Sequence, residues 1–193
     1  MSTTLSAPPA ASRVDANELR VTRVRPLRGP NYWRLAPVIA CDVRLGALEH
    51  LSTAELPGFT ERLLDALPTL REHPCSRGSA GGFVERLEEG TRLPHVLEHV
   101  SLELQTLAGS DVSFGRVVPS GDEGVWWVIV AYEEEAVGVE SMHEAARLVR
   151  ASIAEQHKPG SAAPPANWGA FGRGKRPNHF KMVPLVRLER TLR

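Results

Sequence analysis

Residues 94–109 read PHVLEHVSLELQTLAG, and this stretch predicts a long helix at the centre of the fold. At about 100° per residue, its apolar side chains form one narrow stripe, as in a helix that faces a core. The stripe consists of Leu93, Leu97, Val100, Leu104 and Leu107. His95, Glu98 and His99 fall on the opposite side of the helix. Leu102 interrupts that polar side, which indicates that it is also covered, at least in part.

The spacing of the polar residues suggests a zinc site. Histidines at positions i and i+4 of a helix point the same way and can share one tetrahedral zinc ion. Glu98, next to His99, completes the order H-x-x-E-H, which is typical of inverzincin peptidases, and it would act as general base. Polar helix faces also carry His and Glu by chance, so an ordinary solvated face stays open as the alternative.

The flanking segments predict strands and shorter helices. Alternating or β-branched runs predict strands at 18–27, 37–46, 112–118 and 125–132, the last two joined by the turn PSGDEG. Amphipathic runs predict helices at 55–73 with a break at Pro68, at about 82–89 and at 141–157. The order is roughly ββαααββα, which predicts an α+β, two-layer domain with a mainly antiparallel sheet packed by helices.

Composition bounds the domain and its environment. Residues 1–18 are rich in Ser, Ala and Pro and predict a disordered leader, 19–157 a single domain, and 158–193 a Pro/Gly-rich linker with a basic tail. The 23 basic and 23 acidic residues cancel, so we do not expect a bulk nucleic-acid binder. Cys41 and Cys75 lie far apart and predict reduced thiols, most simply buried fillers, in a soluble cytoplasmic protein. No apolar run is long enough to span a membrane.

Four stretches carry a resemblance to a known family. LRGPNYWR (27–34), LPGFTERLLDALPTLREHPCSRG (56–78), GGFVERLEEGTRLPHVLEHVSLELQTLAG (81–109) and DVSFGR (111–116) together resemble the N-terminal domain of cyanophycin synthetase. The resemblance covers about residues 22–155. That enzyme builds a polymer of aspartate that bears arginine on each side chain, using ATP-grasp and Mur-ligase-like domains. A free-standing N-terminal domain of 193 residues lacks both, so we do not expect it to act as a ligase on its own.

The resemblance implies two functions. In the family this domain is associated with holding the polymer and, in some members, with a zinc-peptidase-like site that cuts polymer to make primers; His95, Glu98 and His99 match that site. We therefore expect zinc-dependent endo-hydrolysis of the cyanophycin backbone to give short primers. The alternative is a non-catalytic module that binds cyanophycin or a related Asp-Arg polymer, with a cyanophycin synthetase as a further candidate partner.

The resemblance also points to further residues. A third zinc ligand is expected at Glu134 or Glu135, which match acidic positions of the family, with Glu103 as the local alternative; a solvated acidic strand end stays open. A polymer-binding patch is expected at Arg23, Arg28, Arg34, Tyr32 and Trp33. Arginines would pair with carboxylates, and aromatic faces would stack on guanidinium groups. Ordinary surface arginines and core aromatics are the alternative.

Overall fold

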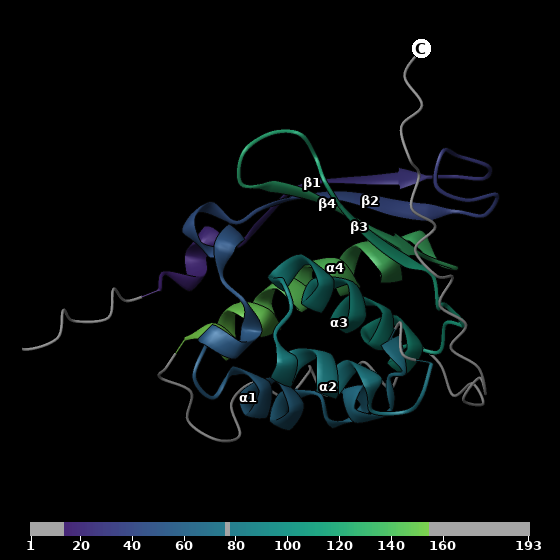
Figure 1. Ribbon diagram of the computed structural model, residues 1–193. Helices are drawn as coiled ribbons and strands as arrows, with labels where there is room; N and C mark the ends of the chain where they lie inside the picture. The colour runs from purple at the N-terminus through teal and green to yellow at the C-terminus, as the bar shows by residue number, and fades with distance from the viewer. Residues whose placement is uncertain (1–13, 76–77, 155–193) are drawn as a thin grey trace, which may run out of the picture.

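A four-stranded antiparallel sheet forms one side of the protein in a computed structural model, which describes residues 14–75 and 78–154 (Figure 1). Across the sheet the order is β1 (Arg20–Leu27), β2 (Val38–Arg44), β4 (Val125–Ala131) and β3 (Gly115–Pro119). The two central strands, β2 and β4, read VIACDVR and VWWVIVA, and such β-branched and aromatic residues favour strands. The register places Cys41 opposite Val128.

Strands β3 and β4 form the hairpin that the sequence predicts. They are antiparallel neighbours, with Val117 opposite Val128, and residues 120–124 connect them. Together with the helices below, this arrangement confirms the α+β class and the predicted order of elements.

The four α-helices of the described residues lie on one side of the sheet (Figure 1). They are α1 (Phe59–Ala66), α2 (Gly82–Glu89), α3 (Leu93–Leu107) and α4 (Glu135–Ile153). Helices α3 and α4 pack against the strands, and α1 and α2 lie farther from the sheet. Short 3-10 helices connect these elements: η1 (Ala16–Glu18), η2 (Gly46–His50), η3 (Thr53–Glu55) and η4 (Pro68–Glu72). The predicted break at Pro68 is the point where α1 gives way to η4, because proline cannot continue a helical hydrogen-bond ladder.

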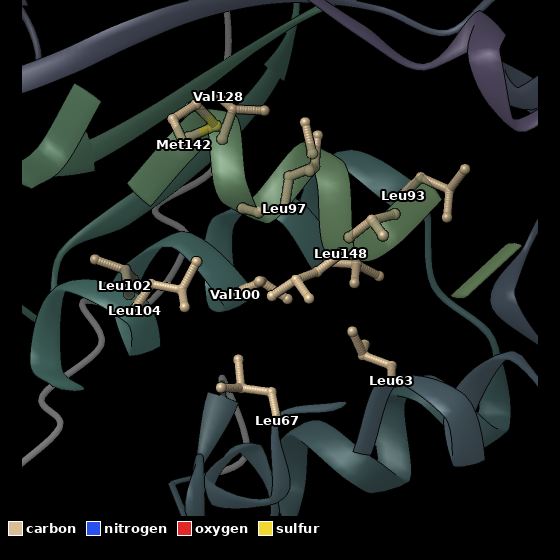
Figure 2. Packing of buried hydrophobic residues seen from close by; sticks show 14 of the residues in the cluster. Leu63, Leu67, Leu93, Leu97, Val100, Leu102, Leu104, Val128, Met142 and Leu148 are labelled. Carbon is tan, nitrogen blue, oxygen red and sulfur yellow. The ribbon is translucent and has the colours of Figure 1, made fainter. Parts of the chain in front are cut away.

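Helix α3 is enclosed on nearly every side. The stripe that contains Leu97 and Val100 packs into the main core, and Leu102 on the opposite side is also fully buried. In Figure 2, Leu63 and Leu67 point from the α1 region towards Val100 on α3 and Leu148 on α4. The prediction that the polar side of this helix is covered is thus confirmed, since elements pack on both of its sides.

Helix α4 begins six residues earlier than the sequence indicated. A solvated strand end was the open alternative for the acidic run 133–135, but Glu134 precedes the first turn of α4 and Glu135 opens it. Acidic side chains there interact favourably with the positive end of the helix dipole.

The described residues begin at Val14, so most of the expected leader and all of the tail 158–193 lie outside them. Within the described ranges, no helix has the length and apolar composition needed to cross a membrane.

Candidate functional site

A cluster of histidines lies between α3, α2 and the segment that follows η4. His95 and His99 are one turn apart on α3, and their rings are 4.8 Å apart. The ring of Phe83 from α2 stacks on His99 with a centroid distance of 4.1 Å. Because His99 is 0% exposed and flanked by an aromatic ring, its orientation is fixed by packing.

Cys75 joins the two histidines. One ligand atom from each of Cys75, His95 and His99 lies within 4.8 Å of the others, and Cys75 Sγ is 3.4 Å from His95 Nε2. The backbone of Cys75 has φ = 51°, a region that residues other than glycine rarely adopt. Such strained conformations gather at functional sites, where the surrounding fold enforces them. Here the loop directs the thiol towards α3.

A chain of hydrogen bonds links Glu103, His73 and His99. Glu103 Oε2 lies 2.6 Å from His73 Nε2, and since a carboxylate only accepts, this nitrogen of His73 donates. In a neutral His73 the other nitrogen, Nδ1, is then an acceptor, and it lies 3.2 Å from His99 Nδ1. With His73 in this neutral form, His99 donates from Nδ1 and keeps a lone pair on Nε2. That Nε2 is buried and has no hydrogen-bond partner within the described chain.

His95 has a comparable partner. Its Nδ1 lies 2.9 Å from Thr91 Oγ1, and when Nδ1 donates to this hydroxyl, the lone pair of Nε2 faces Cys75. Burial lowers the pKa of His95 to about 4, and the charge of Arg86 adds to this effect. Burial also lowers the pKa of His99 well below its ordinary value, with His95 and His73 contributing. Both imidazoles are thus neutral at pH 7, the form that binds metals.

The donor set fits a zinc ion. Two imidazole nitrogens and one sulfur are ligand types that zinc prefers, and three protein ligands with one free position are typical of catalytic zinc. The unpartnered Nε2 of His99 supports this assignment, because a buried polar atom without a hydrogen-bond partner calls for an explanation. Thr91 contacts His95 directly, and Glu103 reaches His99 through His73. Outer-shell contacts of this kind commonly hold zinc-binding histidines in place.

Glu98 lies on the side of α3 that faces β3. Its carboxyl packs against Gly115, where an added Cβ would come within 2.4 Å of Glu98 Cγ. Glu98 is 3% exposed, and its Oε1 has no hydrogen-bond partner among the described residues. Burial raises the pKa of this carboxyl to about 8. A buried carboxyl with a raised pKa is typical of functional sites, and Glu98 directly precedes His99 in the chain.

The glutamates expected to provide the third zinc ligand either bind other residues or are exposed. Glu135 accepts two hydrogen bonds from Arg28, at 2.6 Å from Nε and 2.8 Å from Nη2. Glu134 is exposed just before α4, and Glu103 is bound to His73. Cys75 instead completes the group that the described residues bring together. In the sequence, Cys75 lies far from Cys41 and outside any C-x-x-C pattern, which is why it was expected to be a buried filler.

The residues of the expected polymer-binding patch lie around the β1–β2 connection. Tyr32 is 85% exposed, and its ring meets Trp33 edge to face at 5.0 Å. Trp33 in turn contacts Trp127 of β4 at 6.1 Å. A pocket of ≈ 200 Å³ opens here, lined by Arg25, Leu27, Tyr32, Trp33, Ala40 and Trp127.

The arginines of this patch are mostly engaged. Arg34 lies over the Phe114 ring at 5.3 Å, and Arg23 lies 3.7 Å from Asp42. Arg28 holds Glu135, as described above. The structure therefore brings the aromatic residues of the patch together, whereas its arginines are spread over different partners.

Comparisons with known proteins agree with the family resemblance described from the sequence. A family model described as the cyanophycin synthase-like N-terminal domain matches residues 40–154. The cyanophycin synthetases of Trichormus variabilis and Crocosphaera subtropica are 41% and 39% identical to the chain over 137 residues, and that of Geminocystis herdmanii is 40% identical over 138. Each match covers 70% of this chain, but the chain spans only 15% or 16% of the length of these relatives.

Proposed function

The chain belongs to the family of cyanophycin synthase-like N-terminal domains, and from this premise we propose that it cuts the backbone of cyanophycin at a zinc site formed by Cys75, His95 and His99. Family membership supports a role related to cyanophycin. The observation that carries the catalytic part is the convergence of three zinc-type ligand atoms within 4.8 Å. The unpartnered Nε2 of His99 supports it further.

In the proposed reaction, water adds to the carbonyl carbon of an aspartyl peptide bond and the C–N bond breaks. A zinc ion at this site would supply Lewis acidity, which acidifies water and polarises a peptide carbonyl. Glu98 takes a proton from the attacking water and delivers it to the departing amine. Glu98 must be ionised to accept that proton. The positive charge of a zinc ion at the site would favour the ionised form of this carboxyl.

The test follows the release of soluble fragments. Purified protein is incubated with insoluble cyanophycin, with added zinc or with a chelator, and soluble Asp-Arg oligomers are measured by mass spectrometry. We expect oligomers that depend on zinc. Glu98→Gln should abolish them while polymer still sediments with the protein, and Glu61→Gln, an exposed position on α1, serves as the control. Cleavage by the Glu98 variant at the wild-type rate would show that the general base is assigned wrongly.

Cys75 provides a second test of the same site. Cys75→Ala should lower the amount of bound zinc and the rate of cleavage together, because it removes one of three ligands. Cys41→Ala is the matched control, since Cys41 lies in β2 and is likewise buried. Equal zinc content in the two variants would exclude Cys75 as a ligand.

A second candidate function is binding of the polymer without cleavage. The exposed Tyr32 and the adjacent pocket beside Trp33 and Trp127 favour it, because aromatic faces bind guanidinium groups. Replacing Arg28 and Arg34 together by alanine should then weaken co-sedimentation with the polymer, more strongly at low salt. If zinc yields no oligomers but the polymer is still pulled down, this candidate replaces hydrolysis.

A further inference from the structure

A second pocket, of ≈ 490 Å³, lies between the start of β1 and the outer surface of α4. Its polar lining consists of Arg20, Glu140, His143, Glu144, Arg147 and Arg150. None of the residues of the candidate zinc site comes from β1 or α4. The pocket is therefore a separate site, and its volume falls within the range of about 300–1,000 Å³ that is typical of small-molecule sites.

One ion pair closes part of this pocket. Arg147 donates from Nε to Glu144 Oε2 at 2.8 Å and from Nη2 to Oε1 at 2.5 Å. Both residues are on α4, three positions apart, so the pair is formed within one helix. These two side chains neutralise each other and form part of the pocket wall.

The other charges of the pocket lack such partners. Arg20 donates from Nε to the carbonyl of Asn17 at 2.9 Å, and Arg150 donates from Nη1 to the carbonyl of Leu19 at 3.2 Å. These bonds to the backbone hold the two guanidinium groups at the pocket but do not neutralise them. Within the described chain, neither arginine makes an ion pair, and neither does the exposed Glu140.

The pocket thus offers two cations and one anion to a ligand. An arginine joined to an aspartate side chain must be attached through its amino group, which leaves its carboxylate and guanidinium free. Each unit of the polymer therefore carries one negative and one positive group on the same residue. Guanidinium groups of a protein bind carboxylates, and a protein carboxylate binds guanidinium.

We propose that this pocket binds one aspartyl-arginine unit of the polymer, with Arg20 and Arg150 holding the carboxylate and Glu140 the guanidinium. The inference rests on the proposed action on cyanophycin. Because the pocket is separate from Cys75, His95 and His99, it would hold the chain at a distance from the point of cleavage. Several units along one polymer could then engage the protein at once, which raises its overall affinity.

Calorimetric titration with the soluble dipeptide β-aspartyl-arginine tests the pocket directly. Arg20→Glu and Glu140→Arg should each weaken binding roughly tenfold, since each replaces an attractive charge by a repulsive one. Both positions are exposed, so the variants should fold, as circular dichroism would verify. Arg71→Glu, at an exposed position on η4, is the control and should leave binding unchanged.

A second probe separates the two charges. Agmatine has the guanidinium of arginine without its carboxylate, so Glu140→Arg should weaken agmatine binding, whereas Arg20→Glu should not. If neither Arg20→Glu nor Glu140→Arg changes the affinity for the dipeptide, the inference is overturned. If the wild-type protein binds the dipeptide but releases no oligomers from the polymer in the presence of zinc, that result counts against the proposed hydrolysis and not against the pocket.

Discussion

Replacing Glu98 by glutamine should stabilise the metal-free protein at neutral pH. The carboxyl is buried, and burial raises its pKa from 4.5 to about 8. Between these two values the folded protein binds more protons than the unfolded chain, so its stability falls as pH rises. Glutamine is close in shape and carries no charge, so it escapes this loss.

The size of the effect follows from the pKa values. From pH 4.5 to pH 7 the group spans about 2.5 pH units, and at about 1.4 kcal/mol per unit the wild type loses roughly 3 kcal/mol relative to the variant. At pH 5 the same reasoning gives less than about 1 kcal/mol. The lowered pKa values of His95 and His99 act in the opposite direction, but both proteins share them, so they cancel in the difference.

The assay is urea unfolding of both proteins in a chelator, at pH 5 and at pH 7. We expect the Glu98→Gln variant to be more stable at pH 7 and the two curves to converge towards pH 5. The exposed Glu61→Gln change should show no such pH dependence. A variant that is equally or less stable at pH 7 would refute the reasoning, because the buried carboxyl would then carry no cost of ionisation. A destabilising buried carboxyl of this kind is expected where function rather than stability fixes the residue.

Three further outcomes test the site. Glu103→Gln should weaken zinc affinity about 10–100-fold in a competition assay with a chromophoric chelator, since it disturbs the chain of hydrogen bonds that orients His99; unchanged affinity would remove Glu103 from that role. Gly115→Ala should destabilise the protein by about 1–3 kcal/mol in urea unfolding, because the added methyl group overlaps the Glu98 side chain, and a neutral result would mean that this carboxyl is free to move. Cobalt substituted for zinc should show a sulfur-to-metal charge-transfer band in the near ultraviolet that disappears in Cys75→Ser, whereas a band that persists would exclude thiolate ligation.

The hydrophobic pattern predicted the main elements of the fold. The stripe of Leu97 and Val100 identified α3, and the run VWWVIVAY with its preceding turn identified the β3–β4 hairpin. Both are local signals, because they depend on the period of one helix or one strand. The start of α4 was missed, since glutamates at a helix N-terminus look the same in sequence as a solvated strand end.

Part of the candidate site was also present in the local pattern. His95 and His99 are one turn apart on a single helix, so their shared direction could be derived from spacing alone. The same spacing does not identify the elements that pack against each side of that helix. The histidines meet α2 and the segment after η4, and Glu98 meets β3.

The sequence by itself determined the class of fold, the family resemblance and the pair of histidines, because each is encoded in residues that are near one another in the chain. Only the tertiary structure decided that Cys75, and neither Glu134 nor Glu135, lies beside these histidines. It also decided that Arg20 and Glu140 line one pocket. Contacts between distant segments depend on how helices and strands pack, and the period of an isolated element carries no information about its partner.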